Sequence, residues 1–228
     1  MSLPARASFL VFLACCLQQG AAASGWHPPG SPPMNGAQKL LAAYRDLSGG
    51  MLDAAETEYR QVLKERPHEI DALLGLAVIS QRKHQPDQAA RYYRQVLNED
   101  MGNAAAAAGL IGLSIPADPA GAESELKELL DIQPSSPELQ YALGNALASE
   151  LRMGEAEHAY LIAHTLAPDN ALYAYNLAVS LDRLHRPDEA LPYYEKSLSL
   201  SMQAPGLFDP HPVRRRIREI NGSGEAKR

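Results

Sequence analysis

A spacing of about 34 residues that recurs between positions 139 and 194 constrains the fold of this chain more than any other feature. Leu143 is matched by Leu177 one such spacing later, and Tyr160 is matched by Tyr194. Self-similarity at a fixed period of about 20–50 residues is typical of proteins built from stacked repeats. We therefore predict a quasi-one-dimensional stack of repeats, in which each unit packs on its neighbours instead of around one centre.

Each period contains helical patterns. Ala55, Tyr59 and Val62 lie at i, i+4 and i+7, which places them on one face of a helix, and Pro67 ends the segment. The same three residue types return one period later, at positions 89, 93 and 96. The repeating unit is thus predicted to be a pair of helices joined by a short turn.

The Leu-Gly pair at positions 143–144, followed by Ala156, Tyr160 and a terminal Pro168, resembles the tetratricopeptide repeat (TPR) pattern. The resemblance implies an all-α fold: a right-handed superhelical solenoid of about five helix–turn–helix repeats with a C-terminal capping helix. The predicted TPR solenoid spans residues 37–202, with repeats at 37–67, 70–101, 104–134, 137–168 and 171–202.

The third repeat is the least regular. It opens on a run of alanines at 104–108, and Gly109 and Gly112 each lower helix propensity by about 1 kcal/mol relative to alanine. We expect this repeat to be the weakest part of the solenoid.

A break and a capping helix are predicted for residues 203–220, with a flexible tail at 221–228. Val213, Ile217 and Ile220 form an apolar stripe at i, i+4 and i+7 that would cover the exposed end of the fifth repeat. Four arginines at positions 214–216 and 218 allow a second interpretation, in which this helix binds phosphate or anionic lipid. A solvated cap is favoured because the chain is acidic overall.

Residues 1–23 are predicted to be a signal peptide. Arg6 precedes an apolar run at 7–17 that is too short to span a bilayer, and Ala21 and Ala23 fit a signal peptidase site before Ser24. Cys15 and Cys16 also lie in sequences similar to a bacterial lipobox, so lipidation at either cysteine remains an alternative. Residues 24–36, rich in proline and glycine, are predicted to be a linker.

The composition argues against several classes of function. A net charge of −6 does not suit a nucleic-acid binder. No cysteine follows Cys16, and the seven histidines show no metal-binding spacing. No nucleophile, phosphate-loop or dinucleotide motif is present. We predict a binding module without enzymatic activity, cofactor or metal.

Binding is expected on the inner face of the first helix of each repeat, an assignment that rests on the geometry implied by the TPR resemblance. Apolar and aromatic residues dominate this predicted groove, which would suit a helical or extended segment of another protein better than an acidic tail. The predicted groove residues are Leu40, Tyr44, Leu74, Val78, Arg82, Tyr141, Asn145, Tyr175, Val179, Asp182 and Arg183.

Two stretches, 139–145 (LQYALGN) and 173–184 (YAYNLAVSLDRL), are similar to exported TPR proteins of Gram-negative bacteria. Those proteins assist the assembly of type IV pili, MSHA-type pili and type II-like secretion systems. The resemblance implies a periplasmic scaffold, or an outer-membrane lipoprotein if a cysteine is lipidated, that helps to assemble such an apparatus. The alternative is an adaptor for an envelope peptidoglycan or polysaccharide enzyme.

Overall fold

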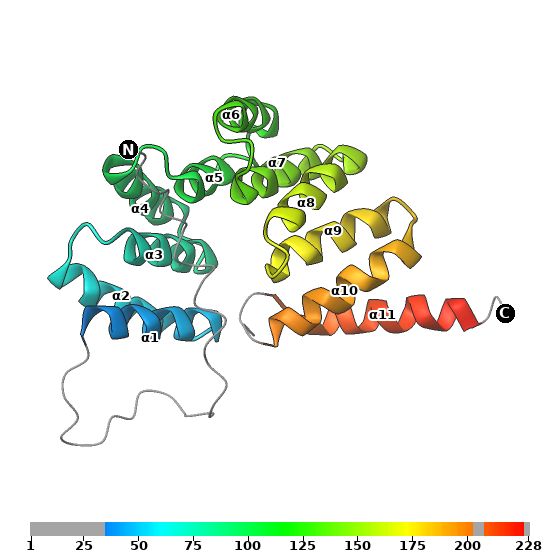
Figure 1. Ribbon diagram of the computed structural model, residues 1–228, viewed down its shortest axis with the longest axis horizontal. Helices are drawn as coiled ribbons and strands as arrows, with labels where there is room; N and C mark the ends of the chain where they lie inside the picture. The colour runs from blue at the N-terminus through cyan, green and yellow to red at the C-terminus, as the bar shows by residue number, and fades with distance from the viewer. Residues whose placement is uncertain (1–34, 203–207, 226–228) are drawn as a thin grey trace, which may run out of the picture. The chain divides into compact units, whose positions relative to one another are not determined.

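The computed structural model describes residues 35–202 and 208–225, which form eleven α-helices and no β-strand (Figure 1). The predicted all-α architecture is confirmed. The predicted signal peptide, both candidate lipidation cysteines and nearly all of the predicted linker lie outside the described residues.

Ten of the helices follow one another in five consecutive pairs, and an eleventh follows the last pair. The helices are α1 (Gly36–Ser48), α2 (Leu52–Glu65), α3 (Ile70–Arg82), α4 (Pro86–Glu99), α5 (Ala104–Gly112), α6 (Pro119–Ile132), α7 (Pro137–Ser149), α8 (Met153–Leu166), α9 (Ala171–Arg183), α10 (Pro187–Ser201) and α11 (Pro210–Glu225).

Local sequence determines where most helices start. Asn170 caps α9 by accepting hydrogen bonds from the backbone N–H groups of Leu172 and Tyr173. Such a cap satisfies donors that have no partner within the helix. Proline occupies the first position of α4, α6, α7 and α10, where a missing N–H costs nothing and the fixed φ suits a helix.

The core is a succession of clusters, each shared by neighbouring helices. Glycines of one helix face the tyrosine rings of another, as where Gly144 of α7 lies against the ring of Tyr160 of α8 and Gly75 of α3 lies against Tyr59 of α2. The serial arrangement follows from the repeat period, because every repeat presents the same apolar faces to its neighbours.

The third repeat departs from the others. Its first helix, α5, has nine residues, whereas the first helices of the other four repeats have thirteen. Figure 1 shows α6 nearly end-on while α5 and α7 lie across the view. Ala108 and Ile111 of α5 share a cluster with Leu126 of α6 and Leu139 of α7, whereas Ile132 at the end of α6 is 75% exposed.

One inter-helix turn contains a strained leucine. Leu151, between α7 and α8, has φ 63° and is 79% exposed, while Gly50 adopts φ 80° at the corresponding turn between α1 and α2. The left-handed region costs an L-residue roughly 1 kcal/mol or more, and glycine almost nothing.

We expect Leu151→Gly to raise the stability of the protein by about 1 kcal/mol, because it removes that strain without removing a buried contact. The matched change, Gly50→Ala, should lower stability by a similar amount. Chemical denaturation of both variants checks this, and a destabilised Leu151→Gly protein would contradict it.

Helix α11 follows the fifth repeat as a capping helix, and it continues to Glu225, five residues beyond the end predicted at residue 220. Val213 and Ile220 are buried in the cluster that α8, α9 and α10 form, and Arg216 reaches back to Asp182 of α9. Within residues 35–202 and 208–225, none of the helices combines the length and the apolar character needed to cross a bilayer.

Candidate functional site

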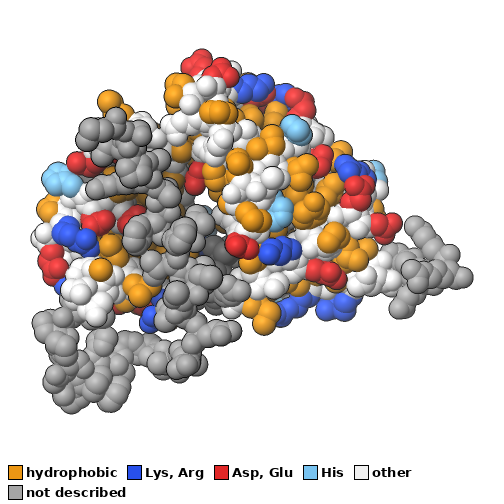
Figure 2. Space-filling model, in the orientation of Figure 1, with side chains coloured by type: hydrophobic (Ala, Val, Ile, Leu, Met, Phe, Trp, Pro, Cys, Tyr) orange, Lys and Arg blue, Asp and Glu red, His pale blue; other side chains and the backbone are white. Residues whose placement is uncertain are grey.

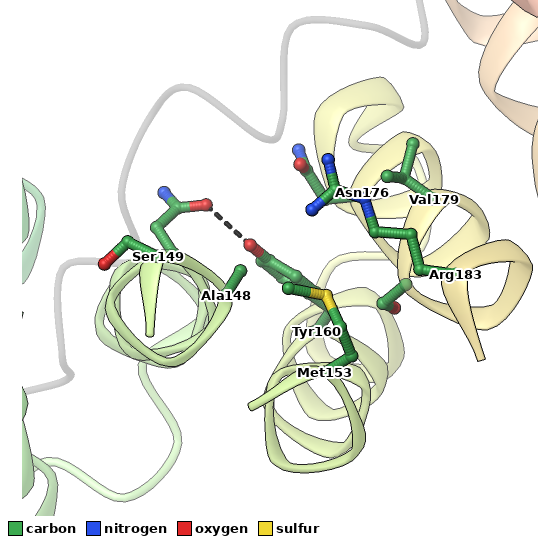
Figure 3. A pocket seen from close by; sticks show the side chains of 9 residues that line it. Ala148, Ser149, Met153, Tyr160, Asn176, Val179 and Arg183 are labelled. Carbon is green, nitrogen blue, oxygen red and sulfur yellow. Dashed lines mark hydrogen bonds between the residues drawn. The ribbon is translucent and has the colours of Figure 1, made fainter. Parts of the chain in front are cut away.

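An open cavity of about 290 Å³ lies between α7 and α9, the first helices of the fourth and fifth repeats (Figure 3). We call it the α7–α9 cleft. Residues of α8 complete it: Met153 from the first turn, and Tyr160 from the middle. The lining residues are Asn145, Ala148, Ser149, Met153, Tyr160, Asn176, Val179, Ser180 and Arg183.

Three predicted groove residues meet in this cleft: Asn145, Val179 and Arg183. The Oδ1 atom of Asn145 accepts a hydrogen bond of 2.8 Å from the hydroxyl of Tyr160, which fixes the amide at the cleft wall. Arg183 is exposed and makes no hydrogen bond or ion pair with any described residue. Its guanidinium therefore remains able to donate to an acceptor on a bound segment.

Asn176 is a cleft residue that the groove pattern omits, although it follows the predicted Tyr175 directly. Its Nδ2 atom donates to the backbone carbonyl of Leu172 at 3.0 Å and to the hydroxyl of Tyr141 at 3.2 Å. The sequence did hold one indication of its role: Asn176 is the single polar side chain in the otherwise apolar and aromatic stretch 171–179. Its partner on α7 becomes visible only once the two repeats are stacked.

Tyr141 is engaged within the protein. Its ring centroid lies 4.9 Å from that of Tyr173 and 5.8 Å from that of Tyr160. Burial raises the pKa of the Tyr141 hydroxyl. Tyr141 packs α7 against α8 and α9, so a substitution here would disturb the contacts between these helices as well as any binding surface to which Tyr141 contributes.

The C-terminal segment covers two more of the predicted groove residues. The ring of Phe208 stacks on Tyr175, with centroids 4.9 Å apart and planes at 17°. The carboxylate of Asp182 accepts two 2.7 Å hydrogen bonds from Arg216 and one of 3.2 Å from the hydroxyl of Tyr194. The hydrogen bonds from Arg216 hold the pKa of Asp182 below its ordinary value.

The chain matches the tetratricopeptide repeat family over residues 40–104 and 141–205, more than half of its length. This chain belongs to the tetratricopeptide repeat family. The unmatched interval, 105–140, coincides with the irregular third repeat and the start of the fourth. A thermophilic TPR protein of Thermus thermophilus superimposes with a TM-score of 0.65 and 22% identity. The match covers 82% of this chain and 98% of that protein, which supports the TPR solenoid fold.

Two of the curated relatives are cellulose synthase operon proteins of Komagataeibacter. Cellulose synthase operon protein C of Komagataeibacter sucrofermentans is 34% identical over 74 residues, 32% of this chain. Cellulose synthase 2 operon protein C of Komagataeibacter xylinus is 41% identical over 54 residues, 24% of this chain. The matched part spans 6% of the first relative and 4% of the second. TPR units are in general non-catalytic scaffolds for protein–protein interaction.

The predicted groove residues of the first two TPR repeats lie apart from the α7–α9 cleft. Arg82 donates a 3.0 Å hydrogen bond to the backbone carbonyl of Leu47 at the end of α1, so it joins two repeats. Leu40, Leu74 and Val78 are partly buried against the core clusters of these repeats. Tyr44 of α1 is 41% exposed.

No group of three or more histidine, cysteine, aspartate or glutamate side chains within the described residues could hold a metal ion. The cleft contains no carboxylate among its lining residues. Its chemistry is that of amide, hydroxyl and guanidinium groups beside the apolar side chains of Ala148, Met153 and Val179.

Proposed function

We propose that this TPR protein is a scaffold of the bacterial cell envelope that binds a segment of a partner protein in the α7–α9 cleft. The observation that carries the proposal is the exposed Arg183, which has no partner among the described residues and stands beside Val179 in an open cavity. Its guanidinium suits backbone carbonyls or a carboxylate of an extended or helical segment, and Val179 and Met153 suit an apolar side chain of that segment.

We further propose that the partner belongs to a polysaccharide synthesis or export apparatus. Support comes from the partial similarity to cellulose synthase operon protein C, which reaches 34% identity over 74 residues. The export signal inferred from residues 1–23 agrees with a location in the envelope. Assembly of a pilus or secretion apparatus is the second candidate, which rests on the similarity of the stretches 139–145 and 173–184.

We expect Arg183→Glu to weaken partner binding by about tenfold or more while leaving the fold intact. Val179→Asp should weaken binding as much and also lower stability, because Val179 packs against the core cluster of the fourth and fifth repeats. Both side chains line the cleft, and Arg183 makes no hydrogen bond or ion pair with a described residue that would hold the repeats together. Quantitative cross-linking in whole cells, followed by mass spectrometry, would measure the partner recovered by each variant.

Arg94→Glu on the exposed surface of α4 is the matched control, because it makes the same charge change away from the cleft. Equal recovery by wild type, cleft variants and control would refute the cleft assignment. The identity of the protein that the cleft variants lose decides between a polysaccharide apparatus and a pilus or secretion apparatus. A partner outside the envelope would refute both candidate functions.

A further inference from the structure

The outward surface of α11 carries a cluster of cations that the partner cleft does not use. Arg214, Arg215 and Arg218 are all exposed, and we call them the arginine face. Figure 2 shows lysine and arginine side chains gathered along the edge that α11 occupies in Figure 1. This cluster stands out because the chain as a whole carries a net charge of −6.

Contacts on the opposite side of α11 fix the orientation of the arginine face. Val213 and Ile220 are buried against the fifth repeat, and Arg216 donates two hydrogen bonds to Asp182. Apolar packing and a charged pair thus hold the helix in one orientation. The arginine face points to solvent in that orientation.

The arginine face is poorly compensated within the protein. Arg214 and Arg218 make no hydrogen bond or ion pair with any described residue, and the Nε of Arg215 lies 3.8 Å from a carboxylate oxygen of Glu219. Arg214 and Arg218 are also four residues apart on one helix, a spacing at which like charges repel. An external anion would relieve this repulsion.

We propose that the arginine face docks on an anionic phospholipid surface. None of the exposed large apolar side chains of the described residues lies on α11, so this face lacks the apolar or aromatic centre of a protein interface. Lipid headgroups require only charge and hydrogen-bond donors, and a guanidinium can donate two parallel bonds to one phosphate.

The membrane affinity expected of the arginine face is too weak to anchor the protein alone and suits a second point of attachment beside a stronger one. Each cation beside an anionic leaflet strengthens binding by roughly fivefold, so three cations give reversible docking. Stable association requires two signals, such as a lipid chain together with a basic patch. The apolar run at residues 7–17, or a lipid at Cys15 or Cys16, would supply the other signal if it is retained.

Sedimentation of the full-length protein with lipid vesicles tests the proposal. Vesicles of phosphatidylcholine and phosphatidylglycerol in equal parts are compared with vesicles of phosphatidylcholine alone. The triple variant Arg214→Gln, Arg215→Gln, Arg218→Gln is compared with Lys64→Gln, Arg91→Gln, Arg94→Gln. The control removes the same charge from exposed side chains of α2 and α4.

We expect the arginine-face variant to bind anionic vesicles on the order of a hundredfold more weakly than wild type. The control variant should stay within about threefold, and added salt should weaken binding by wild type. Equal binding of wild type to neutral and anionic vesicles would overturn the proposal, as would equal losses in the two variants. Binding to polyglutamate without binding to anionic vesicles would assign the face to an acidic protein instead.

Discussion

Replacement of Gly144 by alanine is expected to destabilise the protein by about 2 kcal/mol. A Cβ atom at this position of α7 would lie 2.5 Å from Cε1 and 2.6 Å from Cδ1 of Tyr160. The ring cannot move away easily, because Tyr160 is 3% exposed and its hydroxyl is hydrogen-bonded to Asn145. Relief of the clash requires α7 and α8 to separate, which opens a close-packed interface.

Thermal unfolding followed by circular dichroism would measure this effect as a midpoint lowered by roughly 5 °C. Gly154→Ala in α8 is the matched control, since nothing lies within 4 Å of its added Cβ atom. The control should be neutral or more stable by about 0.5 kcal/mol, as alanine restricts the unfolded chain. Equal midpoints for the two variants would show that the approach of Gly144 to Tyr160 is not tight in solution.

Replacement of Asp182 by asparagine is expected to release α11 from the fifth repeat. The carboxylate accepts two 2.7 Å hydrogen bonds from Arg216, and charge-assisted hydrogen bonds contribute about 1.5–3 kcal/mol each when measured by mutation. The asparagine amide carries no charge and cannot accept both. Hydrogen exchange should therefore show faster exchange throughout α11, while α3 and α4 keep their protection.

The Asp131→Asn variant on the exposed surface of α6 serves as the control and should leave α11 unchanged. Arg216→Gln should accelerate hydrogen exchange in α11 to the same extent. The double variant should show no faster exchange than either single variant, because both changes remove the same contact. Full protection of α11 in Asp182→Asn would mean that Val213 and Ile220 hold the helix by themselves.

The same contact makes the docking of α11 sensitive to acid. Arg216 lowers the pKa of Asp182 in the folded protein below its value in the unfolded chain. The stabilisation is therefore complete above the unfolded pKa, about 3.9, and is lost as the pH falls through the lower folded value. The protection factors of α11 amides in wild type, which correct for the slower intrinsic exchange in acid, should fall below about pH 4, whereas those of Asp182→Asn should show a smaller pH dependence.

Much of the fold is readable from local sequence. The positions of Ala156, Tyr160 and their counterparts one repeat later predict helix pairs, because one apolar face recurs in each period. Prolines and capping residues such as Asn170 mark where helices begin, and the stripe through Val213 and Ile220 predicts the capping helix. The irregularity of the third repeat is predictable from its alanines and glycines, but the orientation of α6 is not, because it depends on the cluster that α6 shares with α5 and α7.

The sequence by itself determined that this protein is a stack of helical repeats with a charged cap, since helix periodicity and repeat spacing are properties of the chain. Only the tertiary structure decided which residues of the predicted groove stay open. Tyr141 and Asp182 belong to the same predicted groove as Asn145 and Arg183, yet Tyr173 covers the first and Arg216 binds the second. The physical reason is that helices about one repeat apart in the chain supply these contacts, and their side chains meet only when the repeats stack.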